Sequence, residues 1–165
     1  MRDIKHYKPY GKANSLRNWY RVKNPLRIAF NFIIIYTARY LPSIRLKNAL
    51  YRITGAKIGK DVSFALGAIP DIFYPEMIEI GDNSIIGFNA TILAHEFIID
   101  EWRVGKVKIG KNVVIGANST ILPGIEIGDN SIISAMSLVN KNVPENTFAG
   151  GVPVRKIKML RNKGR

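Results

Sequence analysis

The stretch IGKNVVIGANSTILPGIEIGDNSIISAMSLVNKN, residues 109–142, decides the fold of this 165-residue chain. An aliphatic residue recurs at every sixth position, namely at Ile109, Ile115, Ile121, Ile127, Ile133 and Val139. A period of six matches neither the helical period of about 3.6 residues nor the two-residue period of a half-buried strand. It is typical of a solenoid in which each block forms a short strand and a tight turn. Three blocks then make one triangular coil, and the aliphatic residues stack inside.

The same spacing occurs earlier in the chain, but it is interrupted twice. The first interruption is PDIFYPEMIE, residues 70–79, where two prolines favour a bulge from the coil. The second follows from the 29 residues that separate Ile80 from Ile109, because 29 is not a multiple of six. Residues from about 96 to 106 are therefore expected to leave the coil as a loop that begins directly after His95. Loops that interrupt repeats tend to lie on one face and to carry function.

The first 56 residues lack the six-residue period, and the sequence therefore predicts two parts. These are an N-terminal arm with a helical extension over residues 1–56 and a β-helix domain over residues 57–165. We expect residues 1–14 to form a loosely ordered arm. Helices should follow, with Ser15 as the N-cap of the first and Pro25 at the start of a second.

The most hydrophobic segment of the extension is LRIAFNFIIIYTARYL, residues 26–41. It has 16 residues and includes two arginines, whereas a helix that crosses a bilayer needs about 20 apolar residues. Two compatible interpretations remain open: a helical cap on the β-helix, or helices that lie on a membrane surface with basic and aromatic residues at the headgroups. No cleavage site typical of a secretory signal follows the basic start of the chain. We therefore expect a cytoplasmic location, with peripheral contact at the inner face of the membrane as an option.

Charge is concentrated at the two ends of the chain, although the formal net charge is +13. Residues 1–60 carry 14 basic residues (Lys or Arg) and one acidic residue. Residues 61–154 carry 5 basic and 11 acidic residues, and residues 155–165 carry 6 basic and no acidic residues. The acidic solenoid argues against nucleic-acid binding, because it would repel a phosphate backbone. The chain has no cysteine, which excludes disulfides and a cysteine nucleophile. One histidine in the repeat region is too few for the three-histidine metal site of a γ-class carbonic anhydrase, and no metal is expected.

Two motifs link the repeats with a known family. The segment TILAHEF, residues 91–97, leads into the second interruption, and GVPVR, residues 151–155, follows the last repeat. Together with the repeats, they resemble the hexapeptide-repeat acyltransferases, in particular maltose and galactoside O-acetyltransferases and the acetyltransferases of surface polysaccharides. The resemblance implies a mainly β fold: a left-handed parallel β-helix with an N-terminal helical extension and a short C-terminal helix, here over residues 154–160. It also implies a homotrimer whose cofactor grooves lie between neighbouring subunits.

His95 is the candidate catalytic residue. Acyl transfer to a hydroxyl needs a base that removes the proton as the oxygen attacks a thioester, and imidazole titrates in the right range. From its position alone, His95 could equally be a hydrogen-bonded structural residue, and the resemblance of TILAHEF to the family's catalytic segment favours the base. Its other ring nitrogen needs an orienting partner, for which Asp71, Glu96 and Glu126 are the acidic candidates. Asp71 and Asn89 could instead bind the acceptor, although the sequence departs here from the acceptor-binding Asn and Asp of the family.

The resemblance implies acetyl-CoA as the acyl donor. Small residues at the corners of the later coils would let the pantetheine arm approach the backbone, and basic residues after the last coil would bind the phosphates. The matching positions are Ala117, Ser134, Ala135, Asn140, Lys141, Arg155, Lys156 and Lys158. The alternatives are that tight corners simply require small residues and that the basic tail is only solvated.

These features predict an acyl-CoA-dependent, in the first place acetyl-CoA-dependent, O-acyltransferase that acts on a hydroxyl of a carbohydrate or a lipid-linked glycan. Direct transfer in a ternary complex fits the absence of cysteine. N-acylation of an amino sugar is an alternative that the sequence does not distinguish. A non-catalytic β-helix scaffold is an alternative of another class, and it predicts that loss of His95 leaves the biological activity intact.

Overall fold

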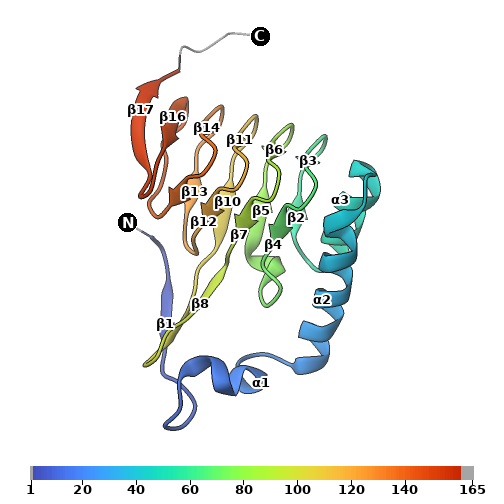
Figure 1. The fold of residues 1–165 in the computed structure, drawn as a ribbon, viewed down its shortest axis with the longest axis vertical. Helices are drawn as coiled ribbons and strands as arrows, with labels where there is room; N and C mark the ends of the chain where they lie inside the picture. The colour runs from blue at the N-terminus through green and yellow to red at the C-terminus, as the bar shows by residue number, and fades with distance from the viewer. Residues whose placement is uncertain (1, 161–165) are drawn as a thin grey trace.

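Short parallel strands form the three faces of a prism in the computed structural model, which describes residues 2–160 (Figure 1). The first face consists of β2 (Lys57–Ile58), β5 (Ile78–Ile80), β10 (Val107–Ile109) and β13 (Glu126–Ile127). The second consists of β3 (Ser63–Phe64), β6 (Ile85–Ile86), β11 (Val114–Ile115), β14 (Ile132–Ile133) and β16 (Thr147–Gly150). The third consists of β4 (Ile69–Pro70), β7 (Thr91–Ile92), β12 (Thr120–Ile121) and β15 (Leu138–Val139). One passage through the three faces makes one coil, and the predicted parallel β-helix is confirmed. The left-handed winding stays a prediction.

The aliphatic residues at every sixth position form the core of the prism. Ile80 pairs with Ile109, and Ile109 pairs with Ile127 in the next coil, so that like residues stack in register. On the other two faces, Ile115 and Ile121 are completely buried. Because each coil alone cannot bury its apolar side, this stacking supplies the hydrophobic stabilisation of the fold.

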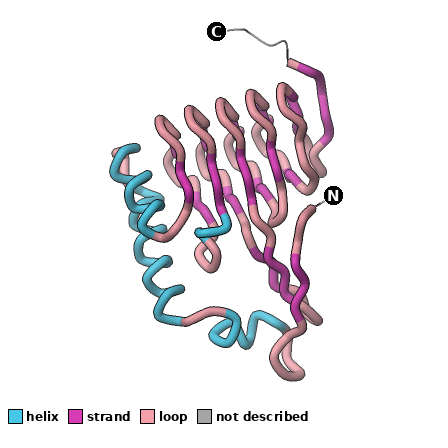
Figure 2. The backbone as a smooth tube through the Cα atoms, turned by 180° about the vertical axis from the view of Figure 1, so that it is seen from behind, coloured by secondary structure: helices cyan, strands magenta, loops and turns pink. Residues whose placement is uncertain are grey.

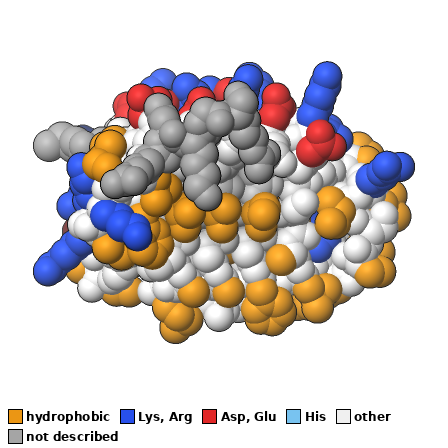
Figure 3. Space-filling model, turned by 90° about the horizontal axis from the view of Figure 1, so that it is seen from above, with side chains coloured by type: hydrophobic (Ala, Val, Ile, Leu, Met, Phe, Trp, Pro, Cys, Tyr) orange, Lys and Arg blue, Asp and Glu red, His pale blue; other side chains and the backbone are white. Residues whose placement is uncertain are grey.

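The residue that precedes each buried aliphatic residue points outward, since successive strand residues face opposite sides of a sheet. The outward rows are Lys57, Glu79, Lys108 and Glu126 on the first face, Ser63, Ile85, Val114, Ile132 and Phe148 on the second, and Ile69, Thr91, Thr120 and Leu138 on the third. The first face is therefore charged, whereas the second carries a mainly apolar row. Figure 3 shows hydrophobic side chains in rows that run along the stack of coils.

Two helices, α2 (Pro25–Tyr40) and α3 (Ile44–Ile53), cover the first coil (Figure 1). A 3-10 helix, η1 (Ser15–Asn18), and the short α1 (Trp19–Val22) precede them. Pro25 occupies the first turn of α2, as predicted, and the side chain of Asn24 caps this helix by accepting from the Leu26 amide. Ser15 is not the N-cap of η1; Asn14 caps it, and the buried Ser15 hydroxyl donates to the carbonyl of Ile98. Within residues 2–160, no helix is both long enough and apolar enough to cross a bilayer.

Helix α3 closes the end of the β-helix with polar side chains. The first coil has no preceding coil, so its carbonyl groups on that side need other partners. Lys47 donates to the carbonyls of Phe64 and Ala65 at 3.2 and 3.1 Å, and Asn48 donates to the carbonyl of Val62 at 2.7 Å. Burial lowers the pKa of the Lys47 ammonium. The interpretation of the helices as a cap is therefore confirmed.

Part of the N-terminal arm forms a strand, and the prediction of a loosely ordered segment was wrong for residues 5–7. Strand β1 (Lys5–Tyr7) pairs antiparallel with β9 (Trp102–Val104), which pairs with β8 (His95–Phe97). The predicted loop at about 96–106 does leave the coil, but as a β-hairpin with β1 as its third strand. The arm is held there because the Tyr7 ring stacks on Trp102 with centroids 4.2 Å apart. Figure 2 shows the chain continuing from this small sheet past the coils to the cap.

The predicted C-terminal helix over residues 154–160 is instead a strand, β17 (Arg155–Met159), which pairs antiparallel with β16. The edge of β16 offers free backbone partners to any segment that can extend along it. The sequence RKIKM alternates basic residues with Ile157 and Met159 over part of its length, which suits a strand with a period of two. The helical interpretation gave too much weight to the length and positive charge of this segment.

Candidate active site

His95 begins β8, at the point where the chain leaves the third face of the prism. Strands β4 and β7 are parallel neighbours, with Ile69 opposite Thr91 and Pro70 opposite Ile92. The residues that follow these two strands therefore lie side by side. This pairing brings Asp71 to His95 across 24 positions of sequence.

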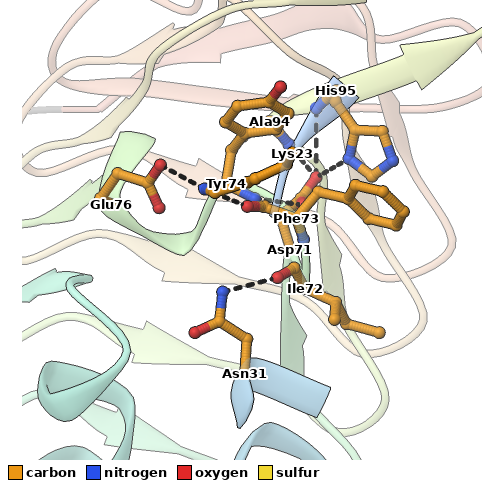
Figure 4. Close-up of polar contacts among 9 residues, drawn as sticks. All are labelled: Lys23, Asn31, Asp71, Ile72, Phe73, Tyr74, Glu76, Ala94 and His95. Carbon is orange, nitrogen blue, oxygen red and sulfur yellow. Dashed lines mark hydrogen bonds and ion pairs between the residues drawn. The ribbon is translucent and has the colours of Figure 1, made fainter. Parts of the chain in front are cut away.

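Asp71 accepts hydrogen bonds at both carboxylate oxygens and is 3% exposed. Its Oδ1 accepts from the backbone amides of Phe73 and Tyr74 at 2.8 and 3.0 Å, which shapes the turn after β4. Its Oδ2 accepts from the amides of Ala94 and His95 at 2.7 and 3.1 Å and lies 2.6 Å from His95 Nδ1 (Figure 4). The carboxylate is thus fixed by four backbone groups before it meets the imidazole.

The environment keeps Asp71 ionised despite its burial. Desolvation is the largest single effect and opposes the charge, but the hydrogen bond and charge of His95 act against it, together with the amides of Tyr74 and Ala94. The net result is a pKa for Asp71 below its usual value. An ionised carboxylate can only accept, so the proton in the 2.6 Å contact belongs to His95 Nδ1.

This contact fixes the other ring nitrogen of His95 as a hydrogen-bond acceptor. With the proton on Nδ1, Nε2 of the neutral ring carries a lone pair. Figure 4 shows this nitrogen on the side of the ring that faces away from Asp71. The His95 side chain is 15% exposed, so Nε2 can take a proton from a group that approaches the surface. The arrangement is that of a general base with an orienting carboxylate.

Aromatic rings surround His95, and the sequence did not point to them. Ring centroids of Phe73, Phe97 and Tyr74 lie 4.5, 5.0 and 6.0 Å from the imidazole centroid. Burial, reinforced by the charge of Glu76, raises the pKa of Tyr74, so its hydroxyl stays neutral. The signal for two of these rings was the pair Phe73-Tyr74 inside the first interruption of the repeat, where the side chains do not belong to the six-residue pattern of the core.

Side chains of the N-terminal segment hold the backbone that carries Phe73 and Tyr74. The ammonium of Lys23 donates to the backbone carbonyl of Phe73 and to Oε1 of Glu76, and it lies 4.3 Å from the centroid of the Tyr74 ring. Asn31 of α2 donates to the carbonyl of Ile72 at 2.9 Å (Figure 4). No local pattern in the sequence could have indicated these contacts, because they join segments about 40 to 50 positions apart.

The other acidic and amide candidates lie apart from the His95 ring. Glu96 accepts from Arg2 at 2.8 Å, and alternation along β8 turns its side chain away from the face that carries His95 and Phe97. Asn89 lies at the corner between β6 and β7, in the left-handed region with a φ of 54°. Its side chain accepts from Arg39 and donates to Asn118, so it serves the corner and the cap. The charged side chain of Glu126 points outward on the first face, where it pairs with Lys108.

The positions matched to the donor site fall on two different corners and one end of the prism. Ala117, Ser134 and Ala135 lie between the second and third faces, whereas Asn140 and Lys141 follow β15 on the same corner column as His95. Arg155, Lys156 and Lys158 are exposed on β17, at the opposite end of the stack from the cap (Figure 1). A single chain therefore does not gather these residues around His95. In residues 2–160, no three side chains of His, Asp or Glu come together as a metal site.

Comparison with known proteins agrees with this architecture. The sequence profile described as "Bacterial transferase hexapeptide (six repeats)" matches residues 106–141. The Bacillus subtilis (strain 168) protein YvoF, whose acetyltransferase name is provisional, is 53% identical over 148 residues, which cover 89% of this chain and 86% of YvoF. A solved hexapeptide-repeat acetyltransferase of Vibrio cholerae O1 biovar eltor, complexed with acetyl coenzyme A, superimposes with a TM-score of 0.69 at 20% identity and covers 83% of this chain and 88% of its own. A maltose O-acetyltransferase of Clostridium difficile 630 superimposes with a TM-score of 0.59 at 25% identity, with coverages of 84% and 90%. The identity with YvoF across most of both chains, together with the repeat match, shows that this chain belongs to the hexapeptide-repeat acetyltransferase family.

Proposed function

We propose that this protein is an acetyltransferase that moves the acetyl group of acetyl-CoA to a hydroxyl of a carbohydrate or a lipid-linked glycan. The observation that carries the proposal is the buried, ionised Asp71 with its Oδ2 2.6 Å from Nδ1 of a half-buried His95. Similarity to a maltose O-acetyltransferase supports a hydroxyl acceptor. A cytoplasmic location is part of the proposal, because acetyl-CoA is a cytoplasmic metabolite.

In this mechanism His95 acts as the general base. The acceptor hydroxyl donates its hydrogen bond to Nε2, and the proton passes to Nε2 as the oxygen bonds to the thioester carbonyl carbon. The carbon–sulfur bond breaks, and the thiolate of CoA leaves and takes the proton from His95 Nε2, which restores the neutral base. Asp71 stabilises the imidazolium that forms, and the half-buried rings of Phe73 and Phe97 reduce the access of water to it. No acyl group becomes attached to the protein.

The corner between the second and third faces fits the donor. Ala117 is half-buried and Ala135 is exposed, so the side chains at these two positions are small and accessible. Gly116 lies so close to the next coil that an added Cβ would approach the amide nitrogen of Ala135 within 2.3 Å. Small residues thus serve the packing of the coils and leave the corner open to a narrow pantetheine chain. Arg155, Lys156 and Lys158 on β17 would hold the phosphates, and Asn140 and Lys141 lie on the corner column of His95.

The separation of His95 from this corner within one chain supports a homotrimer in which neighbouring subunits complete each site. The mainly apolar outward row of the second face, with Ile85 47% exposed, is the surface that we assign to the subunit contact. The first face carries alternating charges, such as Lys108 with Glu126 at 3.1 Å, and is suited to solvent.

Ile85→Lys is expected to convert the trimer to monomers, because it places a charge in the apolar row at the contact. Sedimentation velocity measures the change, and turnover should fall with it, since each site needs two subunits. Glu126→Lys on the first face is the matched control and should leave the trimer intact. A wild-type protein that sediments as a monomer at micromolar concentration would contradict the shared site.

The proposed activity is tested by release of free thiol from acetyl-CoA in the presence of neutral sugars, amino sugars and glycolipids. We expect turnover with neutral sugars or glycolipids and O-acetylated product by mass spectrometry. Turnover with amino sugars alone, and an N-acetylated product, would overturn the hydroxyl assignment. Absence of both turnover and acetyl-CoA binding would favour a scaffold.

A further inference from the structure

Helix α3 of the cap buries polar side chains and exposes apolar ones, which is the reverse of an ordinary amphipathic helix. Lys47, Asn48 and Tyr51, which are buried residues of α3, face the first coil, where they donate to its open carbonyl groups. Leu46 and Ile53 lie on the other side of the same helix and are 49% and 55% exposed. The need to satisfy the end of the β-helix with polar groups leaves the apolar side of α3 to face outward.

Helix α2 also presents an apolar surface to the outside. The residues Leu26, Phe30, Ile33, Tyr36 and Tyr40 recur at intervals of three or four and are 80%, 40%, 62%, 37% and 61% exposed. This spacing places them on one side of the helix, opposite the buried residues Ile28, Asn31, Ile35 and Ala38. Together with Leu46 and Ile53 of α3 they form a surface that we call the cap face.

The only two charged residues of α2 flank the cap face, since the guanidinium carbons of Arg27 and Arg39 each lie 5.4 Å from a ring centroid of that face, those of Phe30 and Tyr40. Arg27 donates to the carbonyl of Thr54 at 2.9 Å, and Arg39 donates to the carbonyl of Gly67 at 2.8 Å. Both arginines therefore fasten α2 to α3 and to the first coil. The apolar row from Leu26 to Tyr40 itself contains no charged residue, and the helix of 16 residues is about 24 Å long.

The segment that forms the cap carries charge of one sign. The sequence from residue 4 to residue 60 contains no Asp or Glu. Arg17, Arg21 and Arg45 are exposed, and within the described part of the chain none of them has a carboxylate within 4 Å. Trp19 and Tyr20, next to these cations, are 36% and 51% exposed. An apolar helix face with aromatic and basic neighbours is the pattern of a helix that lies in the interface of an anionic membrane.

Charge also argues against a second copy of this chain on the same surface. Two cap faces in contact would bring two sets of exposed arginines together, and the segment from residue 4 to residue 60 has no carboxylate to neutralise them. An anionic lipid surface complements the charge and accepts the apolar side chains at the same time. We propose that the cap face docks the protein on anionic lipid membranes, with α2 lying in the plane of the interface. The proposal goes beyond the acetyl transfer and does not depend on it.

The test is flotation of the full chain with vesicles of phosphatidylcholine, with and without phosphatidylglycerol. The wild-type protein is expected to float with the anionic vesicles only, and binding should weaken as salt shortens the screening length from about 30 Å at 0.01 M to about 8 Å at 0.15 M. Ile33→Asp should lower the ratio of bound to free protein about tenfold or more, because it places a charge in the centre of the apolar stripe.

Ile157→Asp is the matched control, because Ile157 is 56% exposed but lies on β17, at the opposite end of the stack from the cap face (Figure 1). It should bind as the wild type does. Circular dichroism and melting temperature show that both variants are folded. Equal binding by Ile33→Asp and the wild type, or no binding to anionic vesicles at low salt, would overturn the proposal. Sedimentation that reveals association in solution, abolished by Ile33→Asp, would assign the cap face to a second copy and would also overturn it.

Discussion

His95→Ala is expected to lower kcat by at least about 10²-fold, the usual contribution of a general base, with little change in the KM for acetyl-CoA. The variant removes the acceptor of the nucleophile's proton but leaves the proposed donor corner, which lies on another edge of the prism, unchanged. A loss confined to kcat is the result expected for an interaction that acts in the transition state. Steady-state thiol release with saturating acceptor measures both parameters.

The second histidine of the chain provides the control for this variant. His6 lies on β1, is hydrogen-bonded through Nδ1 to Glu101 at 2.9 Å, and is exposed. His6→Ala should keep kcat close to that of the wild type. A His95→Ala protein that is folded and turns over at the wild-type rate would rule out the base and favour a scaffold.

The repeat could be predicted from the sequence because the strands of every coil have the same local requirement for a buried residue. One buried aliphatic residue is needed per strand, and its position recurs every six residues whatever the rest of the block contains. Ile109, Ile115 and Ile121 therefore predicted three faces without knowledge of any contact. The place where the chain leaves the coil, after His95, followed from the same arithmetic.

The features that the sequence did not predict depend on contacts between distant segments. Strand β1 is ordered by β9, about 95 positions later in the chain, and neither strand alone has a marked periodicity. β17 is a strand because β16 offers it an edge, and five residues are too few for helical and extended patterns to be told apart with certainty. The burial of the polar side of α3 was also not predicted, because an amphipathic pattern does not by itself determine which side of a helix faces the core.

The site shows the same division between local and distant information. His95 was identified from its motif and its place before the loop, and Asp71 was one of three acidic candidates until the pairing of β4 with β7 set it beside the imidazole. Phe73 and Phe97 were not predicted to lie beside His95, since an aromatic residue in an irregular segment has many possible roles. Their position is set by the amides that Asp71 binds and by the start of β8.

Asp71→Asn is expected to lower kcat by about 10² to 10⁴-fold, because an amide at this place cannot reproduce the charge that stabilises the imidazolium or hold the tautomer with a proton on Nδ1. One end of the Asn side chain is also a donor, whereas both oxygens of Asp71 accept from backbone amides. At least one of those contacts is lost, and the melting temperature should fall as well. Kinetics of thiol release and thermal unfolding measure the two effects.

The pH dependence of stability distinguishes the contribution of the Asp71 charge from that of the shape of its side chain. The pKa of Asp71 is lower in the folded protein than in the unfolded chain, where it is about 3.9. Its ionised form therefore stabilises the folded state above about pH 4, and this contribution is lost as the pH falls through the folded value. The difference in melting temperature between the wild type and Asp71→Asn should be largest near neutral pH and should shrink in acid.

Asp82→Asn is the control. It also removes a carboxylate that accepts from a backbone amide, that of Lys60 at 2.8 Å, but Asp82 lies away from His95 and the variant should retain kcat. Full activity in a folded Asp71→Asn protein would show that His95 does not depend on this carboxylate for its orientation.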